Sequence, residues 1–403
     1  MKRTATWRTP LVVLLAGGAV LALGIGIRQS FGLFLAPMSQ ELGWGREVFA
    51  FGIAVQNLVW GASQPFLGGL ADRYGGGRVV ALSGLAYAAG LYLMASAGDP
   101  LAFHLSAGLL VGLALSGMSF AVVLGAVGRA YPPERRSAAL GLCSAGGSLG
   151  QFLIVPAGQA LIASYGWFFA FSLIAALALL AVPLSTALAG QPAASGPRQS
   201  FRQALAEAGG HSGYRLLIAG FFVCGFHITF IGTHLPAYLG DRGLSPTEAA
   251  NALALIGLFN IAGSLGCGYL GGKFSKKYLL SAVYALRSLA ILAFLLAPSL
   301  PATAYAFAAV LGLLWLGTVP LTSALVAQIF GPAYLGALFG LVFFSHQLGA
   351  FVGVWLGGYA FDTVGSYNAV WWLAILLGVL AAVLHLPIRE AAVIRPRPAA
   401  GAS

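Results

Sequence analysis

Charged residues are scarce in this chain: Asp, Glu, Lys and Arg together make up 8% of its 403 residues. A soluble domain carries about 25%, so the composition excludes an ordinary water-soluble protein. Acidic residues are the scarcest, 10 against 21 basic ones. All ten fall between the long apolar segments of the chain or at the ends of these segments. A bundle of membrane helices built from the segments therefore has no carboxylate in its interior.

Cysteine is also rare, and it occurs only inside apolar segments, as Cys143, Cys224 and Cys267. This placement excludes a disulfide framework and a metal site. The chain has no ATP-binding P-loop, no metal-ligand cluster and no catalytic triad. We therefore expect neither an enzyme nor a primary pump, and no cofactor. A membrane sensor or scaffold is equally disfavoured, because no soluble signalling module is visible.

Long apolar runs are what the chain has in abundance. Hydrophobic residues make up 59% of it, the mean hydropathy is +0.89, and short polar breaks separate runs that are long enough to cross a bilayer. We therefore predict an all-α membrane protein with twelve transmembrane helices. The predicted spans lie near residues 11–36, 48–67, 79–97, 101–128, 137–163, 166–188, 214–239, 249–271, 278–297, 302–329, 334–360 and 367–387.

The basic residues are distributed unevenly about these spans. With the N-terminus inside, seventeen of them fall in inner segments, while the outer loops hold only Arg46 and Arg242. Arg28 and Arg287 lie within spans. This bias is a positive-inside signal, so we expect both termini in the cytoplasm and the chain in the inner or plasma membrane. The net charge of +11 then reflects topology and attraction to anionic lipid, and no nucleic-acid partner is expected.

The two halves of the chain resemble each other. Segment 138–142 recurs at 337–341 and segment 149–152 recurs at 348–351, both with an offset of 199. The polar stretch 190–213 lies between the halves and reads as a cytoplasmic linker. A parallel repeat of this kind places a transporter's substrate site near the midplane, between the halves.

The repeat divides the chain into four parts. The predicted parts are an N-terminal six-helix bundle (1–189), the linker (190–213), a C-terminal six-helix bundle (214–388) and a cytoplasmic tail (389–403).

Arg28 is the most informative single residue. It lies deep in the first span, where a fixed positive charge costs at least about 3 kcal/mol on insertion scales, so we expect it to line a pathway and bind an anion. An arginine fits a carboxylate with two parallel hydrogen bonds. The offset of 199 pairs Arg28 with His227 in the seventh span, which we therefore expect beside the same axis.

The remaining candidate ligands are polar residues within spans, and each could equally be a structural hydrogen-bonding group. His234 shares a helix face with His227. His346 and Gln347 lie near the middle of the eleventh span. The other candidates for the site are Gln56, Asn57 and Asn260.

Two motifs carry a family resemblance. Residues 68–78 (GGLADRYGGGR) resemble the loop signature that follows the second span in the major facilitator superfamily, and residues 131–147 resemble the fifth-span signature of its monocarboxylate transporter and oxalate:formate antiporter group. The resemblance implies two six-helix bundles related by a pseudo-twofold axis and alternating access. It also implies a basic residue in the first span, matched by Arg28. The group's eighth-span Asp and Arg would fall near Asn260 and Ser264, so both charges are absent here.

The same resemblance implies a gating cluster at the inner face. Its expected members are Asp72, Arg73, Arg78, Arg135 and Arg136.

These observations predict a secondary transporter for a small organic anion, monocarboxylate-like, that works as a monomer. Without a buried carboxylate, proton symport would need a histidine or protons carried on the substrate, and anion exchange stays open. The alternative is a proton-driven exporter of lipophilic compounds, with aromatic residues lining its walls.

Overall fold

The computed structural model describes residues 7–189, 206, 208–331 and 335–393, without the side chains of residues 72, 133, 134, 137 and 335–337. Most of the predicted linker and the last ten residues of the predicted tail lie outside these ranges. The described part is helical and contains no strand, which confirms the predicted all-α class. The first half holds α1 (Pro10–Gln29), α2 (Gly32–Leu42), α3 (Arg46–Tyr74), α4 (Gly76–Ala95), α5 (Pro100–Phe103), the π-helix η1 (His104–Leu110), α6 (Val111–Met118), α7 (Phe120–Ala130), α8 (Pro133–Tyr165), α9 (Trp167–Ala178) and α10 (Ala181–Ser185).

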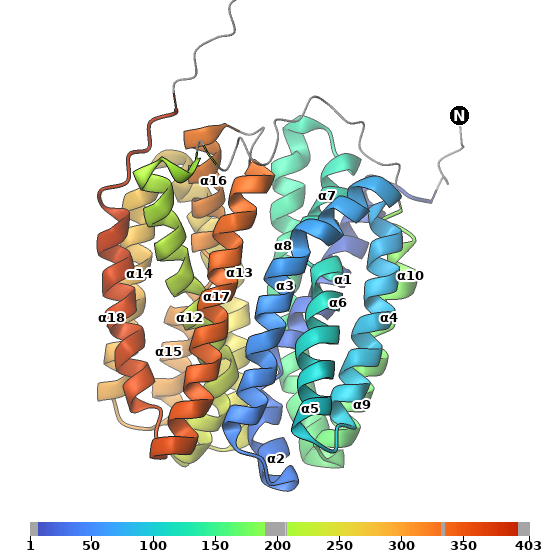
Figure 1. The fold of residues 1–403 in the computed structure, drawn as a ribbon, viewed down its shortest axis with the longest axis vertical. Coiled ribbons are helices and arrows are strands. Elements are labelled where there is room, and N and C mark those ends of the chain that lie inside the picture. Colours follow the sequence, from blue (N-terminus) through green and yellow to red (C-terminus); the bar gives the residue numbers. More distant parts are fainter. Residues whose placement is uncertain (1–6, 190–205, 207, 332–334, 394–403) are drawn as a thin grey trace, which may run out of the picture.

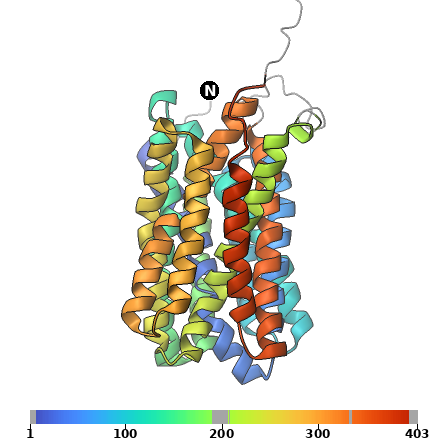
Figure 2. The same ribbon diagram turned by 90° about the vertical axis from the view of Figure 1, so that its left-hand side faces the viewer.

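The second half repeats the pattern with fewer interruptions. It holds α12 (Ser212–Asp241), α13 (Pro246–Lys273), α14 (Lys276–Leu296), α15 (Pro301–Leu314), α16 (Thr318–Phe330), α17 (Leu335–Val364) and α18 (Asn368–His385). The helices of each half gather into one bundle, and α3 and α17 meet at the front seam between the bundles (Figure 1). A view turned by 90° shows the helices running along one common axis (Figure 2).

Eleven spans are long and apolar enough to cross a membrane in the described part of the chain. The remaining predicted span, 48–67, falls within α3, which is 29 residues long. Gln56, Asn57 and Gln64 make this helix polar for its length. Its polarity fits a helix that lies between the two bundles, because a lipid-facing helix would not place three amides in its middle.

Glycines bring the helices within each half into backbone contact. A Cβ added at Gly26 of α1 would lie 2.8 Å from the Cα of Gly150 on α8. In the second half, Gly225 of α12 packs against the backbone of α17, and a Cβ at Gly349 would lie 3.1 Å from the nitrogen of Phe226. Gly26 and Gly225, like Gly150 and Gly349, differ by 199 residues. The internal repeat is therefore visible as matching close contacts, which small residues permit.

Four of the predicted spans are broken helices in the described part of the chain. The first breaks between α1 and α2, the fourth at Ser119 between α6 and α7, the sixth between α9 and α10, and the tenth between α15 and α16. Ser119 is extended (φ −93°, ψ −177°), and its hydroxyl donates to the carbonyl of Ser116 at 3.1 Å. Ser119 and Thr318, the first residue of α16, again differ by 199 residues, so the fourth and tenth spans break at matching points.

Two side chains hold the break in the tenth span. Arg287 of α14 donates to the carbonyls of Leu314 (2.6 and 2.9 Å) and Trp315 at the end of α15. Asn260 of α13 accepts a hydrogen bond from the amide of Leu316 at 2.9 Å. Helix ends leave carbonyls and amides unpaired, and these two residues supply the missing partners.

The two bundles contact each other at one end and in the middle of the molecule, but are not packed together toward the other end. We call the side where α1 begins and α18 ends the terminal side, and the opposite side the distal side. On the distal side, a Cβ at Gly32 of α2 would lie 2.6 Å from the carbonyl oxygen of Gly232 on α12. Toward the terminal side, added Cβ atoms would meet nothing within 4 Å at Gly68, Gly69, Gly141, Gly266, Gly268, Gly272 and Gly340. The distal side is therefore closed, and the terminal halves of α3, α8, α13 and α17 are not packed together at these positions.

Candidate functional site

The break in the first span places Arg28 at the end of α1. The Ser30 hydroxyl donates to the carbonyl of Ile27 at 2.7 Å, and the amide of Phe31 donates to the carbonyl of Arg28 at 3.2 Å, which tightens the last turn. Arg28 lies in that turn. A positive charge is favourable there because the carboxyl end of a helix carries partial negative charge.

The guanidinium of Arg28 is held by amides and an aromatic ring. Nη1 donates to Oε1 of Gln29 at 3.3 Å, and Nη2 donates to Oδ1 of Asn57 on α3. The carbon at the centre of the guanidinium lies 5.2 Å from the ring of Trp60. Within the described residues no carboxylate pairs with Arg28, since the ion pair found there joins Arg46 to Asp241. The charge of Arg28 is thus oriented but not neutralised.

Three buried N–H groups, one from each of α1, α3 and α17, have no hydrogen-bonding partner among the described residues: Nε of Arg28, Nε1 of Trp60 and Nε2 of Gln347. Gln347, on α17 of the other half, lies against α3, because a Cβ at Gly61 would come 2.8 Å from its side chain. Unpaired buried donors are unfavourable. A ligand that supplies acceptor oxygens would satisfy them, and an anion would also neutralise Arg28.

His346 continues this arrangement in the second half. Its Nδ1 lies 3.2 Å from Oε1 of Gln347, and its ring stacks on Phe343 with centroids 5.6 Å apart and planes at 5°. Phe343 in turn lies 5.8 Å from Trp60. The sequence-predicted residues Arg28, Asn57, His346 and Gln347 are therefore brought to one region at the interface of the halves, with Trp60 and Phe343 between them.

Amide bridges cross the interface beside this region. Gln29 donates to Gln151 of α8 at 3.3 Å, and Gln151 donates to the carbonyl of Leu253 on α13 at 2.8 Å. Asn260, a predicted ligand, donates to the hydroxyl of Ser148 on α8 at 2.8 Å. Sequence reasoning did not single out Gln29, although its place directly after Arg28 in a buried span was a usable signal.

The other predicted ligands lie elsewhere. Nε2 of His227 lies 2.8 Å from the carbonyl of Ala374 on α18, within its own half and not beside Arg28. Nε2 of His234 lies 2.8 Å from the carbonyl of Val354, near the distal end. Gln56 donates to the carbonyl of Ala107 at 3.0 Å and joins α3 to η1. Each of these three is tied to a neighbouring helix.

The predicted gating residues lie at the terminal side. Arg73, Arg78, Arg135 and Arg136 are exposed, and none of the four is in an ion pair with a described side chain. The guanidinium of Arg136 donates to the carbonyl of Tyr131 at 3.4 Å. The side chain of Asp72 lies outside the described ones. The four described arginines therefore form no ion pair between the halves.

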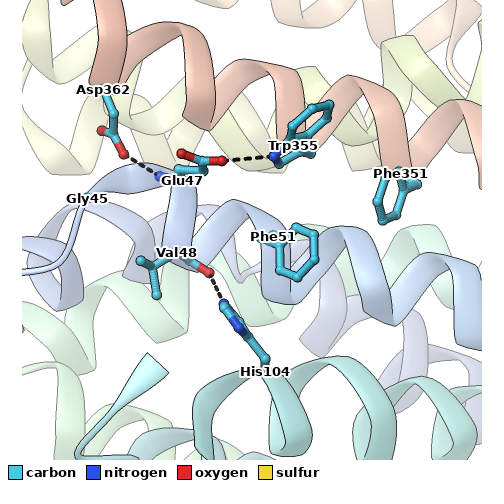
Figure 3. Close-up of a pocket in the computed structure, with 8 residues that line it drawn as sticks. All are labelled: Gly45, Glu47, Val48, Phe51, His104, Phe351, Trp355 and Asp362. Atoms are coloured by element: carbon cyan, nitrogen blue, oxygen red, sulfur yellow. Dashed lines mark hydrogen bonds between the residues drawn. The ribbon is translucent and has the colours of Figure 1, made fainter. Parts of the chain in front are cut away.

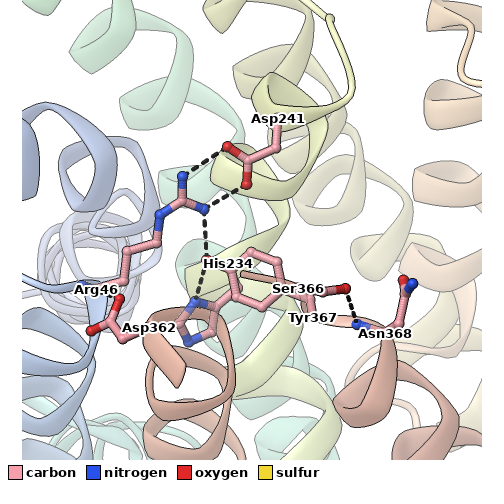
Figure 4. Close-up of polar contacts among 7 residues, drawn as sticks. All are labelled: Arg46, His234, Asp241, Asp362, Ser366, Tyr367 and Asn368. Atoms are coloured by element: carbon pink, nitrogen blue, oxygen red, sulfur yellow. Dashed lines mark hydrogen bonds and ion pairs between the residues drawn. The ribbon is translucent and has the colours of Figure 1, made fainter. Parts of the chain in front are cut away.

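A polar network on the distal side joins the halves instead (Figure 4). Arg46, at the start of α3, makes two hydrogen bonds to Asp241 at the end of α12, at 2.6 and 2.7 Å, and donates to the hydroxyl of Tyr367 at 2.9 Å. That hydroxyl lies 3.3 Å from Nδ1 of His234. Asp362 of α17 accepts the backbone amide of Arg46 at 2.9 Å. We call these residues the distal network.

Comparison with known proteins identifies the class. The model of the Major Facilitator Superfamily matches residues 14–318 and 217–402. The chain therefore belongs to the major facilitator superfamily, which confirms the predicted family and fold. It is a multi-pass membrane transporter and not an enzyme.

Several relatives cover most of the chain. An uncharacterized MFS-type transporter, YcxA of Bacillus subtilis, is 25% identical over 91% of this chain and 92% of its own length. Monocarboxylate transporter 13 of Bos taurus is 28% identical over 91% and 86%, and monocarboxylate transporter 11 of Homo sapiens is 27% identical over 94% and 83%.

Among solved structures, a bacterial homolog of the human lysosomal transporter Spinster, in an inward-facing and unoccupied conformation, matches with a TM-score of 0.77. The identity is 17%, and the match covers 95% of this chain and 97% of that one. At this identity the likeness shows the fold alone.

Proposed function

We propose that this chain carries a small organic anion, monocarboxylate-like, across the membrane by alternating access. The observation that carries the proposal is the state of Arg28. Its guanidinium is oriented by Gln29 and Asn57, has no described carboxylate partner and leaves Nε unpaired. A carboxylate is the ligand whose charge and paired oxygens fit that group.

The second half supplies neutral groups for the rest of the ligand. Gln347 offers an unpaired amide nitrogen, and His346 lies beside it. Trp60 and Phe343 form an apolar layer between the two halves of the site. One fixed cation with neutral donors and an apolar wall suits an anion of single charge with a small apolar body. The names of two relatives, monocarboxylate transporters 13 and 11, agree with this substrate class.

We further propose that the terminal side is cytoplasmic, in the inner or plasma membrane, and that the chain works as a monomer. Most of the described positive residues lie on that side. The structure then corresponds to a carrier closed toward the outside. A fluorescent protein that folds only in the cytoplasm, fused to the C-terminus, tests the orientation: fluorescence is expected, and its absence contradicts the topology.

Besides Arg28, the site contains a histidine, His346, beside Gln347. Proton symport would have to use that histidine or a proton carried on the substrate, whereas exchange of one anion for another needs neither. Uptake into proteoliposomes with an imposed pH gradient, compared with uptake driven by preloaded unlabelled anion, separates the two couplings.

The deciding experiment is a thermal-shift screen of purified protein against mono- and dicarboxylates and neutral analogues. A ligand at a hundred times its dissociation constant stabilises the folded state by about 2.7 kcal/mol. We expect one or more monocarboxylates to stabilise the wild type, and Arg28→Ala to lose affinity by about 100-fold. The affinity of Arg28→Lys should lie between that of the wild type and that of Arg28→Ala, because lysine keeps the charge but not the planar pair of donors.

Arg242→Ala is the matched control. Arg242 bonds to Ser299 and Tyr238 on the distal surface, away from the site, so its loss should leave carboxylate binding unchanged. Stabilisation of the wild type by lipophilic cations alone, with no response to carboxylates, would instead assign the chain to the export of lipophilic compounds.

A further inference from the structure

A cavity lies on the distal side, apart from Arg28. It has a volume of about 670 Å³ and is lined by Gly45, Glu47, Val48, Phe51, His104, Phe351, Trp355 and Asp362. Gly45 directly precedes α3, and the other residues come from α3, η1 and α17, as the close-up shows (Figure 3). Phe51 precedes Asn57 by six residues, which is about 9 Å along a helix. We call this cavity the seam groove.

The seam groove opens on the outer surface of the bundle. α3 and α17 form the front of the molecule, and no other helix lies in front of their seam (Figure 1). Two leucines close in sequence to the groove residue His104 are exposed: Leu105 by 53% and Leu101 by 66%. In a membrane protein such leucines contact acyl chains, so the groove is continuous with the lipid-facing surface.

The walls of the groove are aromatic. The Phe51 ring lies 5.1 Å from the ring of His104 and 6.2 Å from the ring of Phe351, edge to face in both cases. Nε2 of His104 lies 2.9 Å from the carbonyl of Val48, which joins η1 to α3 along the wall. η1 is a π-helix, an irregularity that is frequent at functional sites.

The polar end of the groove is acidic. Glu47 accepts a hydrogen bond from Nε1 of Trp355 at 3.0 Å through one carboxylate oxygen, Oε1. Asp362 accepts the backbone amides of Arg46 and Glu47, at 2.9 and 2.7 Å. Neither carboxylate forms an ion pair with a described residue, because Arg46 pairs with Asp241. Two carboxylates without an ion-pair partner among the described residues therefore lie at the polar end of an apolar, lipid-facing groove.

We propose that the seam groove binds a phospholipid with a primary-ammonium headgroup. The ammonium would donate to Oε2 of Glu47, with Asp362 close by, and an acyl chain would lie along Phe51, Phe351 and Trp355. A charge-assisted hydrogen bond of this kind distinguishes an ammonium from a quaternary headgroup, which has no N–H to donate. An anionic headgroup would be repelled.

Such a lipid would also act on the transport cycle. It contacts α3 of one half and α17 of the other, so it fits the groove only while the distal side is closed. A ligand that binds one of two conformations shifts the population toward that one. The aminophospholipid is therefore expected to favour the distal-closed state.

Native mass spectrometry of the full chain tests this proposal, with the protein released from nanodiscs that hold equal parts of phosphatidylethanolamine and one competing lipid of identical acyl chains. We expect phosphatidylethanolamine to remain bound in preference to phosphatidylcholine in one mixture and to phosphatidylglycerol in the other. Glu47→Gln keeps an oxygen that can accept from Trp355 but removes the charge, so it should reduce the preference for phosphatidylethanolamine by roughly tenfold. Val48→Trp, which fills the groove, should abolish retention of the lipid.

Glu248→Gln is the matched control. Glu248 caps the start of α13, also on the distal side, through Ser245, and should leave lipid retention unchanged. Equal retention of ethanolamine and choline lipids by the wild type overturns the proposal, as does undiminished retention in Val48→Trp. Binding of soluble dodecylamine to the wild type, without any retained phosphatidylethanolamine, would assign the groove to soluble amines. That result would also overturn the proposal. Lipid retention is measured without transport, so the result does not depend on the proposed anion substrate.

Discussion

At the scale of single residues, Arg28 determines the chemistry of the site through what it lacks. Its neighbours Gln29 and Asn57 are amides, which orient a guanidinium and leave its charge in place. A carboxylate at either position would form a buried ion pair and make the site neutral. The proposed preference for an anion therefore rests on an amide at position 57 as much as on the arginine.

Asn57→Asp tests this argument. The aspartate would still accept from Nη2 of Arg28, so the fold should persist, but the new ion pair would replace the substrate as counter-ion. We expect affinity for the carboxylate to fall by about 100-fold, that is by about 2.7 kcal/mol, as measured by ligand-induced thermal stabilisation. Asn368→Asp, at the exposed start of α18, is the control and should bind normally. Unchanged affinity in Asn57→Asp would show that Arg28 does not contact the ligand.

The sequence allowed part of this site to be predicted. Arg28, Asn57, His346 and Gln347 were candidates because a polar side chain inside a span is costly, and the structure brings them together. His227 was a candidate because of the offset of 199, but equal position in a repeat does not give equal orientation. The first span breaks after Arg28, whereas α12 continues through His227, which contacts α18.

Other functional candidates could not be recognised from the sequence. Glu47 lies at the start of a span and reads as an ordinary loop acid. Its place in the seam groove depends on α17, more than 300 residues away in the chain.

At the scale of helices, the glycine contacts make each half a stiff unit. The α1–α8 and α12–α17 pairs meet backbone to backbone at Gly26, Gly150, Gly225 and Gly349. Interfaces packed this closely do not slide gradually, because any added volume forces the backbones apart. Motion between conformations is therefore expected between the halves, not within them.

Gly150→Leu should destabilise the protein. Its side chain would meet the backbone of Ala22 on α1, and overpacking of this kind costs about 1–3 kcal/mol. The melting temperature in detergent measures the effect. Gly141→Leu is the matched control on the same helix, because a Cβ there meets nothing within 4 Å. Equal melting temperatures for the two variants would contradict the close contact.

Hydropathy predicts where a span lies but not whether its helix is broken. Residues 302–329 read as one apolar span, and the break between α15 and α16 was not predicted. Pro320, in the first turn of α16, was the available signal, since proline cannot donate to the preceding turn. Ser119 in the fourth span has no such proline, so that break could be found only through the repeat.

Asn260→Leu should weaken the break in the tenth span. The amide of Leu316 would lose its acceptor and Ser148 would lose a donor. An unpaired buried amide costs about 1–3 kcal/mol, so we expect a lower melting temperature. Asn368→Leu, at an exposed position, should melt like the wild type. A melting temperature of Asn260→Leu equal to that of the wild type would mean that water or another group replaces the side-chain amide of Asn260 as hydrogen-bonding partner.

At the scale of the whole molecule, the distal network and the Gly32–Gly232 contact keep one side closed. The network is partly exposed: the side chain of Asp241 is 36% accessible and that of Arg46 12%. Exposed ion pairs are weak and screened by salt. A weak closure of this kind suits the proposed alternating access, in which the distal side has to open.

Arg46→Ala should shift the population toward a distal-open state. Spin labels at Leu101 and Val364, both exposed on the distal side in different halves, would report a longer distance by pulsed electron resonance. The exchange Arg46→Asp with Asp241→Arg should restore part of the short-distance population, although the bond to Tyr367 is lost. Arg242→Ala is the control. A single unchanged distance in Arg46→Ala would mean that the network does not contribute to closure.

The unneutralised charge of Arg28 also has an electrical consequence. Under the proposed alternating access, the empty protein moves a site with one net positive charge relative to the two aqueous phases, and a membrane voltage acts on that movement with up to about 2.3 kcal/mol per 100 mV. When a singly charged anion is bound, the site is neutral and the same movement is electrically silent. Voltage should therefore set the rate at which the empty carrier returns and leave the loaded step almost untouched.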